Sequence, residues 1–251
     1  MTEAPRADAL IIEGLRFSWP NSTWTLSLPA LSLAAGERLF LHGPSGTGKS
    51  TLLNLIAGTL APQAGRVFVA GEDMATRGGA ARDRLRADQL GIVFQQFNLL
   101  PFLGLVENVT LPCRFSKRRR ERALGRFGSL DAAARHYLEV LGLDVAALSK
   151  RRVVELSVGQ QQRVAAARAL IGGPGLVLCD EPTSALDTRN RDQFVALLFA
   201  ECAAAGAALL FVSHDLTLAA RFPRRQALGE IAGDAAASGV AGTSTAAEAA
   251  A

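Results

Sequence analysis

Lysine is nearly absent from this sequence. Only Lys49, Lys117 and Lys150 are lysine among 27 basic residues, and the other 24 basic residues are arginine. The 23 acidic residues are interspersed with the basic ones, so the formal charge of +4 gives little support to a nucleic-acid-binding protein. No nucleic-acid partner is therefore expected. A lysine that persists in so arginine-rich a chain indicates a site that arginine does not suit.

Cysteine is also scarce, and long apolar runs are missing. Cys113, Cys179 and Cys202 lie far apart, without CxxC spacing or a nearby histidine pair, which excludes the common zinc patterns. We interpret them as reduced, buried thiols. No stretch reaches the roughly 18 apolar residues that a membrane span needs, and residues 1–14 lack an apolar signal segment. The sequence thus predicts a cytoplasmic chain without a membrane span.

The remaining composition is that of a folded protein. Apolar residues make up 49% of the 251 residues and charged residues 20%, which predicts a globular chain with one large domain, with or without a smaller subdomain. From residue 232 onward the sequence is mostly Ala, Gly, Ser and Thr. We expect residues 1–231 to form the domain and residues 232–251 to be a disordered tail.

The pattern along the chain predicts an α/β core. Residues 9–41 read as short strands with breaks at Pro20, Pro29 and Gly36, and the strand at 38–41 leads into a glycine-rich turn. A helix follows up to Gly58, and further strands are expected around Val67, Val69, Ile92 and Phe94. Later segments alternate between helix and strand, which is typical of a parallel sheet with crossovers: helix 160–171, strand 176–179, helix 189–205 and strand 208–212.

The stretch from Pro101 to Leu156 has helical rather than alternating periodicity. Asp131 is the expected N-cap of one helix, and Gly142 is its expected stop. We therefore predict a helical subdomain, at about 101–156, inserted into a P-loop core that has a mainly parallel sheet and an N-terminal antiparallel β subdomain.

A phosphate-binding loop is the clearest motif. The sequence GPSGTGKST satisfies GxxxxGK[ST] and lies between an apolar strand and a helix, the placement that this loop requires. An accidental glycine-rich turn is the alternative. Glycines let backbone N–H groups approach phosphates, and the helix N-terminus favours negative charge. Lys49 is expected to contact the β- and γ-phosphates and Ser50 to ligate Mg²⁺, within a set formed by Gly43, Pro44, Ser45, Gly46, Thr47, Gly48, Lys49, Ser50 and Thr51.

A second motif places two carboxylates at the end of an apolar strand. Asp180 and Glu181 follow the run Leu176–Cys179. Alone, such a pair is most often the start of a solvated loop. Together with a phosphate loop it indicates that Asp180 holds Mg²⁺ and that Glu181 acts as the general base toward the attacking water.

The segment LSVGQQQRV, residues 156–164, resembles the signature motif of the ATPases of ABC transporters. The phosphate loop, Gln95 within VFQQF, the run DEPTSALD at 180–187 and the Ser213-His-Asp215 segment follow in the order and approximate spacing of that family. The resemblance covers most of the chain. It implies an ATPase that binds ATP and Mg²⁺ and powers transport.

The resemblance also implies a role for individual residues. Gln95 is similar to the glutamine that reaches Mg²⁺ and the γ-phosphate, and His214 to the histidine that contacts the γ-phosphate. A lone histidine is more often a core or capping residue. Residues 184–187 are similar to the loop that crosses to a second subunit. The residues that would contact the nucleotide held by the opposite subunit are Ser157, Gly159 and Gln160.

Two positions need separate interpretation. Phe17 and Trp19 both precede the phosphate loop, where the family has an aromatic residue that stacks on adenine. Spacing favours Trp19, and core packing of either ring is the alternative. Val158 replaces the first glycine of the usual LSGGQ signature, whereas Ser157 and Gly159 are retained.

Within the family, the closest resemblance is to bacterial ATPases of the lipoprotein-release and macrolide-export type. It rests on residues 94–101, residues 106–112 and the glutamines at 160–162. It implies two copies arranged head to tail and a separate transmembrane permease at the cytoplasmic face of the membrane, with export or mechanical work rather than import. A soluble ABC-type ATPase acting on DNA or ribosomes is the alternative, and a small-molecule kinase does not explain the signature segment.

The segment 113–130 is longer than that subfamily usually carries at this place. It contains the basic run Lys117-Arg-Arg-Arg-Glu-Arg122. A solvated helix or loop face is the more frequent interpretation of such a run, and contact with a membrane surface or a permease is the alternative.

Overall fold

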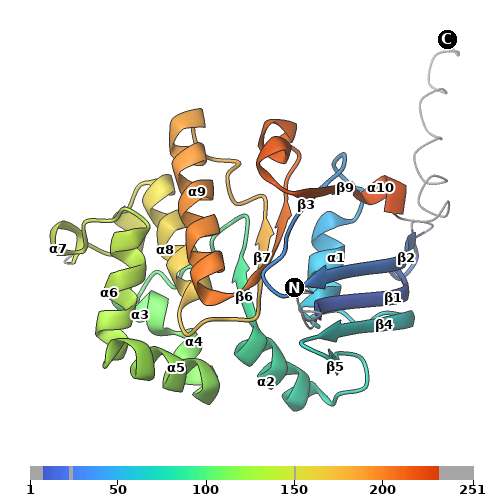
Figure 1. Cartoon of the computed structure of the whole chain (residues 1–251), viewed down its shortest axis with the longest axis horizontal. Coiled ribbons are helices and arrows are strands. Elements are labelled where there is room, and N and C mark those ends of the chain that lie inside the picture. The colour runs from blue at the N-terminus through green and yellow to red at the C-terminus, as the bar shows by residue number, and fades with distance from the viewer. Residues whose placement is uncertain (1–7, 23–24, 150, 232–251) are drawn as a thin grey trace, which may run out of the picture.

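Two β-sheets and a group of helices make up the molecule (Figure 1). The computed structural model describes residues 8–22, 25–149 and 151–231. The antiparallel sheet has the strand order β2-β1-β4-β5, with β1 (Asp8–Ser18), β2 (Thr25–Ala34), β4 (Ala64–Val69) and β5 (Glu72–Asp73). The parallel sheet has the order β6-β7-β8-β3-β9, with β3 (Arg38–His42), β6 (Leu90–Val93), β7 (Leu176–Asp180), β8 (Ala208–Val212) and β9 (Arg224–Ala227).

The N-terminal strands are longer than the sequence predicted. Pro29 lies inside β2 instead of ending a strand, so that prediction was wrong. The reason is that β2 is an edge strand, where a residue without a backbone N–H can be tolerated. The pairing with β1 also passes from Glu13 opposite Ala30 to Leu15 opposite Leu28 without a Cα pair between them. Gly14 and Pro29 are therefore not a registered pair of the ladder.

The parallel sheet agrees with the apolar runs of the sequence. All five residues of β8 are buried, and so are the first four of β7. Continuous burial is expected where helices or a second sheet cover both faces of a parallel sheet. The predicted strand 208–212 is confirmed, and β7 extends one residue beyond the prediction, to Asp180.

Helices cover the parallel sheet, and one of them, α1 (Lys49–Ile56), lies between the two sheets (Figure 1). α1 packs against β4 and β7, whereas α8 packs against β6 and α9. The helices of the core are α1 (Lys49–Ile56), α2 (Gly79–Gln89), α8 (Val158–Leu170), α9 (Thr188–Ala205) and α10 (Leu228–Ile231), together with the 3-10 helix η2 (Leu216–Arg221). α8 begins two residues earlier than predicted because Ser157 caps it.

The described residues between 105 and 155 fold as helices, as their periodicity indicated. They are α3 (Leu105–Thr110), α4 (Pro112–Phe115), α5 (Lys117–Phe127), α6 (Leu130–Val140), α7 (Val145–Leu148) and the 3-10 helix η1 (Val153–Glu155). The predicted N-cap Asp131 is wrong. Ser129 caps α6 by accepting a hydrogen bond from the Ala132 N–H, and Asp131 lies in the first turn. The stop agrees with the prediction, since Gly142 has a φ of 80° just beyond the helix end.

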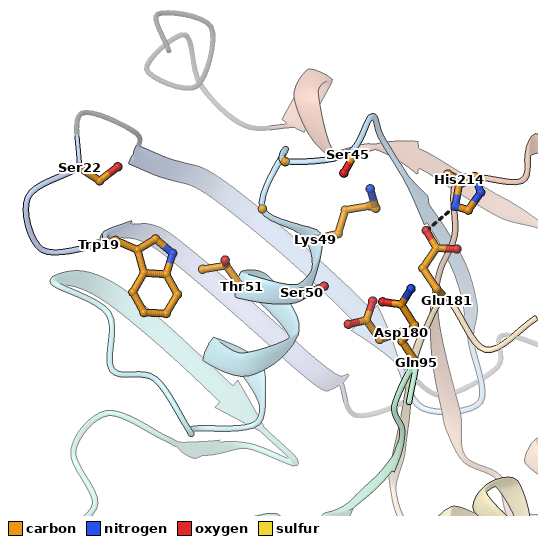
Figure 2. Close-up of a pocket in the computed structure, with 12 residues that line it drawn as sticks. Trp19, Ser22, Ser45, Lys49, Ser50, Thr51, Gln95, Asp180, Glu181 and His214 are labelled. Atoms are coloured by element: carbon orange, nitrogen blue, oxygen red, sulfur yellow. Dashed lines mark hydrogen bonds and ion pairs between the residues drawn. The ribbon is translucent and has the colours of Figure 1, made fainter. Parts of the chain in front are cut away.

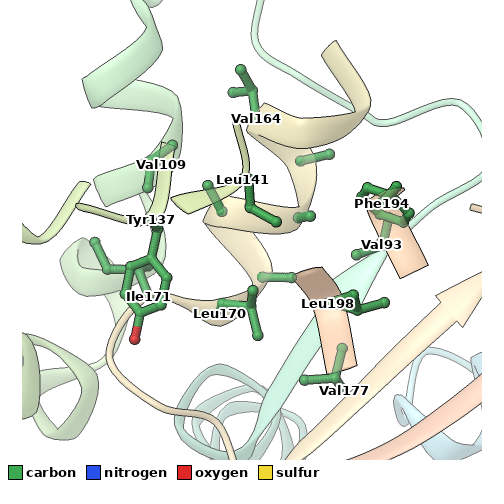
Figure 3. Close-up of a cluster of buried hydrophobic side chains, with 14 of the residues drawn as sticks. Val93, Val109, Tyr137, Leu141, Val164, Leu170, Ile171, Val177, Phe194 and Leu198 are labelled. Atoms are coloured by element: carbon green, nitrogen blue, oxygen red, sulfur yellow. The ribbon is translucent and has the colours of Figure 1, made fainter. Parts of the chain in front are cut away.

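One hydrophobic core joins these helices to the parallel sheet. Figure 3 shows Tyr137 of α6, and Leu141 just past the end of that helix, facing α8, with Val93 and Val177 of the sheet nearby. A second core lies between the two sheets and includes the buried face of α1. The α/β fold class is thereby confirmed. The division at 101–156 stays a prediction, and the predicted tail at 232–251 lies outside the described residues.

Candidate nucleotide site

A cavity of about 670 Å³ opens where the phosphate loop meets the edge of the parallel sheet (Figure 2). Its lining comes from five separate segments of the chain. The lining residues are Trp19, Ser22, Ser45, Gly46, Gly48, Lys49, Ser50, Thr51, Gln95, Asp180, Glu181 and His214. The topology explains why four of these segments meet, because they end or follow β6, β7, β8 and β3, neighbouring parallel strands whose carboxyl ends lie along one edge. The fifth segment, with Trp19 and Ser22, follows β1 of the antiparallel sheet.

The phosphate loop connects the end of β3 to the first turn of α1. Gly46 and Gly48 have φ values of 82° and 96°, a left-handed backbone that glycine adopts without strain. The Lys49 ammonium donates hydrogen bonds to the carbonyls of Gly43, at 2.7 Å, and Pro44, at 2.9 Å. Of the predicted loop, Gly43, Pro44 and Thr47 therefore shape the backbone, whereas the other six residues line the cavity.

The two carboxylates lie at the end of β7. Asp180 is the last residue of the strand, and Glu181 follows with a φ of 47° and donates its N–H to the Val212 carbonyl. Oε1 of Glu181 lies 2.8 Å from Nδ1 of His214, and Oε2 accepts a hydrogen bond of 3.1 Å from the Ser213 hydroxyl. Two residues after β8 thus fix the orientation of the nearly buried Glu181 carboxylate.

The oxygen atoms in this cavity suit Mg²⁺. Gln95 follows β6, and its side chain lies beside Asp180 and Ser50 in Figure 2. Burial raises the pKa of Asp180, and a hydrogen bond with Ser50 partly offsets this effect. Hydroxyl, carboxylate and amide oxygens are hard ligands, and Mg²⁺ in phosphate sites takes few protein ligands because phosphate oxygens and water complete its shell. The residues present therefore fit Mg²⁺.

The two candidate aromatic residues have different surroundings. Phe17 is 7% exposed and belongs to the core, whereas Trp19 is 46% exposed and lines the cavity. Their rings meet edge to face with centroids 5.1 Å apart, so Phe17 supports the indole of Trp19. Ser22 lines the cavity as well, and no motif in the sequence pointed to it.

The signature residues lie apart from this cavity. Ser157, Gly159 and Gln160 line a different hollow together with Asp187. Ser157 and Gln160 form a capping box at the start of α8. Val158 is the first residue of that helix and is 47% exposed, so the valine fits without a steric clash. Asp187 caps α9 by accepting the Asn190 N–H at 2.9 Å.

The comparisons with known proteins agree with this arrangement. A family model described as "ABC transporter" matches residues 26–184. The lipoprotein-releasing system ATP-binding protein LolD of Anaeromyxobacter dehalogenans is 45% identical over 227 residues, which cover 89% of this chain and 92% of the relative. This chain belongs to the ABC transporter family. It is an ATP-hydrolysing, ATP-binding subunit of that family, as the residues of the phosphate loop and signature segment implied.

Solved structures of ABC cassettes share the fold. The ATP-binding cassette MJ0796, described as dimeric in a post-hydrolysis state with ADP and Pi, matches with a TM-score of 0.75 and 31% identity. That match covers 87% of this chain and 93% of the cassette. The protein cbiO1 from Clostridium perfringens matches with a TM-score of 0.68 at 24% identity, covering 84% and 80% of the two chains. The second likeness concerns the fold alone.

Proposed function

We propose that this ABC-type ATPase is the motor subunit for a separate transmembrane permease, and that two copies close head to tail over two Mg-ATP molecules. The observation that carries the proposal is the division of the site residues between two hollows. Lys49, Asp180 and Glu181 line one hollow, and Ser157 lines the other. A second copy would bring its Ser157 to the phosphates held by the first. The dimeric form of the relative MJ0796 supports this arrangement.

In this proposal, each residue of the phosphate cavity has a task that its position allows. Lys49 gives up its hydrogen bonds to the two loop carbonyls and binds the β- and γ-phosphates instead. The backbone N–H groups of the loop bind the same phosphates. Ser50, Gln95 and Asp180 hold Mg²⁺, which supplies charge neutralisation at the phosphates. Glu181 accepts the proton of the attacking water, and His214, which would contact the γ-phosphate, also orients this carboxylate. Trp19 stacks on the base.

A groove next to the cavity is the proposed docking place for the permease. It has a volume of about 630 Å³ and lies between α2 and α4, with Phe94 and Phe115 among its lining residues. Phe115 is 72% exposed. Of the charged side chains in the lining, Arg84 is exposed, Arg86 pairs with Asp83, and Arg119 and Arg168 are buried. The exposed part of the groove is therefore mainly apolar, which suits a cytoplasmic segment with apolar side chains.

In this proposal, the direction of transport is inferred from a relative. The LolD relative is named for lipoprotein release, so we assign export or extraction of a lipid-linked substrate, with this ATPase at the cytoplasmic face of the membrane. Among the described residues, no helix is long and apolar enough to cross a membrane. We assign the membrane-spanning part of the machine to the proposed permease.

Cross-linking from the groove tests the proposal. A photo-reactive amino acid replaces Phe115 in the Glu181→Gln protein, which should hold ATP without hydrolysing it, and membranes of the source cell are irradiated with and without ATP. We expect an adduct to one multi-span membrane protein, and no such adduct when the reactive group replaces Leu216, an exposed residue of η2. Adducts to ribosomal proteins or DNA, without a membrane protein, would favour a soluble ABC-type ATPase and overturn the proposal.

A further inference from the structure

One arginine of the basic run on α5 does not face solvent. Lys117, Arg118, Arg120 and Arg122 are exposed, as expected of a solvated helix face, but Arg119 is only 2% exposed. A buried guanidinium is costly unless its donors are satisfied. Burial lowers the pKa of Arg119 to about 10, so the side chain remains a cation at neutral pH.

The Arg119 guanidinium binds backbone carbonyls at the end of α8 and the start of β6. Nε donates to the Ile171 carbonyl at 2.7 Å, and Nη2 donates to those of Ala169, at 2.6 Å, and Arg168, at 3.3 Å. Nη1 donates to the Leu90 carbonyl at 3.1 Å. The last carbonyls of a helix lack partners within the helix and carry its negative dipole end. Arg119 therefore caps α8 from another element and ties it to β6.

The backbone is closely packed where Arg119 meets the end of α8 and the start of β6. A Cβ atom on Gly91 of β6 would lie 2.3 Å from the Ala169 carbonyl oxygen, and one on Gly172 would lie 2.5 Å from the Arg119 carbonyl oxygen. Ser116, the N-cap of α5, donates to Asp88 of α2. α5 is thus held to α2 through Ser116 and to the end of α8 through Arg119.

Arg168, in the last turn of α8, connects this joint to the loop that carries Gln95. Its guanidinium donates to the carbonyls of Phe97 and Asn98, the latter at 2.6 Å. These two residues have φ values of 57° and 48°, a left-handed backbone that costs free energy in residues other than glycine. The two hydrogen bonds from Arg168 offset this cost and fix the loop two residues after Gln95.

We propose that Arg119 is a positioning residue for ATP hydrolysis: it fixes the end of α8 against β6, so that Arg168 holds the loop that places Gln95 at the metal. The inference rests on the proposed role of Gln95. α8 also carries Ser157 at its other end, about 20 Å away for 13 residues. The same helix therefore links the loop of Gln95 to the hollow that a second copy would cover.

Kinetics of Arg119→Met, with Arg120→Met as the matched control on the same helix, test the inference. We expect Arg119→Met to lower kcat by about ten- to a hundredfold and to raise the Mg²⁺ concentration for half-maximal turnover. The ATP affinity measured in EDTA should stay within about twofold, because the phosphate loop is untouched. Arg119→Lys should restore part of kcat, and Arg120→Met should match the wild-type protein. Normal kcat and Mg²⁺ dependence of Arg119→Met would overturn the inference.

Two further measurements separate this inference from the role of Gln95. The double variant with Gln95→Ala should be no slower than Gln95→Ala alone, and multiplicative losses would overturn the inference. If Gln95→Ala itself hydrolyses ATP at the normal rate, the proposed role of Gln95 is wrong. Amide hydrogen exchange of residues 94–100 then tests whether Arg119 positions this loop. Faster exchange in Arg119→Met supports that positioning, and unchanged exchange rejects it. Arg168→Lys, which keeps the charge but loses the paired donors, gives the same test if Arg119→Met does not fold.

Discussion

Nδ1 of His214 lies 2.8 Å from Oε1 of Glu181, although the two residues follow different strands and are 33 positions apart. The contact holds the carboxylate with one oxygen on the imidazole and the other on the Ser213 hydroxyl. A carboxylate that is fixed before the substrate arrives needs less reorganisation during the reaction. The orientation of Glu181 thus depends on the end of β8 as well as on its own strand.

The first prediction concerns Glu181→Gln. The amide keeps the size of the side chain but cannot accept a proton, so turnover should fall by about 10² to 10⁴-fold. The ATP affinity should remain close to that of the wild-type protein, and ATP should produce a dimer. Single-turnover assays measure the loss of hydrolysis, and light scattering measures the ATP-dependent dimer. An active Glu181→Gln protein would show that another group is the base.

The second prediction concerns Lys49, whose ammonium fits between two carbonyls of the phosphate loop. Lys49→Ala should weaken ATP binding by about ten- to a hundredfold, because a charge-assisted contact with the phosphates is lost. Lys49→Arg keeps the charge and should still be impaired, since a planar guanidinium does not fit the position of a compact ammonium. Isothermal titration measures the affinities, with the exposed Lys117→Ala as control. Unchanged affinities in both Lys49 variants would refute the assignment.

The third prediction tests Trp19 as the surface that stacks on adenine. Trp19→Ala should weaken ATP binding by about threefold to tenfold, which corresponds to 0.5–1.5 kcal/mol for a lost aromatic contact. Trp19→Phe should recover part of the loss. The fold should be unaffected because the indole is half exposed, and circular dichroism verifies this. Equal affinity for ATP in Trp19→Ala and the wild-type protein would remove Trp19 from the site.

The fourth prediction is a loss of stability in mild alkali. Burial raises the pKa of Cys202 to about 12 from a usual value of 9.0 and raises that of Cys179 as well. Above pH 9 the unfolded chain loses thiol protons that the folded chain keeps, so the free energy of unfolding falls with rising pH. The slope is about 1.4 kcal/mol per pH unit for each such thiol. This contribution is fully present below pH 9 and is lost as the pH rises toward 12.

Urea unfolding between pH 8 and pH 10.5 measures this slope. Cys202→Ala removes one thiol, so its stability should decline less steeply than that of the wild-type protein by about 1.4 kcal/mol per pH unit above pH 9. The cavity that the substitution leaves lowers stability at every pH and does not change the comparison of slopes. Parallel pH profiles for the two proteins would contradict the raised pKa of the Cys202 thiol.

The sequence predicted the parts of the site that depend on short, contiguous motifs. The phosphate loop and Asp180 follow strands whose apolar runs are easy to recognise, and the order of parallel strands then brings them together. Ser22 could not be predicted in this way. It belongs to no motif, and it lines the cavity only because the chain turns after β1.

Other predictions were wrong for local physical reasons. Asp131 and Ser129 are both good N-cap residues, and periodicity alone does not show which of them begins α6. Pro29 was interpreted as the end of a strand because the sequence of a strand does not show where that strand lies in its sheet. The edge position of β2, which tolerates the proline, is known only from the sheet order. Arg119 stands among exposed arginines, and only its burial and its hydrogen bonds to the carbonyls at the end of α8 distinguish it from its neighbours.

The separation of Ser157 from the phosphate cavity has a consequence for regulation. If each site needs residues from two copies, the turnover of dilute protein grows with the square of its concentration, and an isolated subunit is idle. A permease that holds two copies together raises their effective concentration to the millimolar range. Subunits made in excess of the permease would then consume almost no ATP, so hydrolysis would be confined to assembled transporters without a dedicated inhibitor.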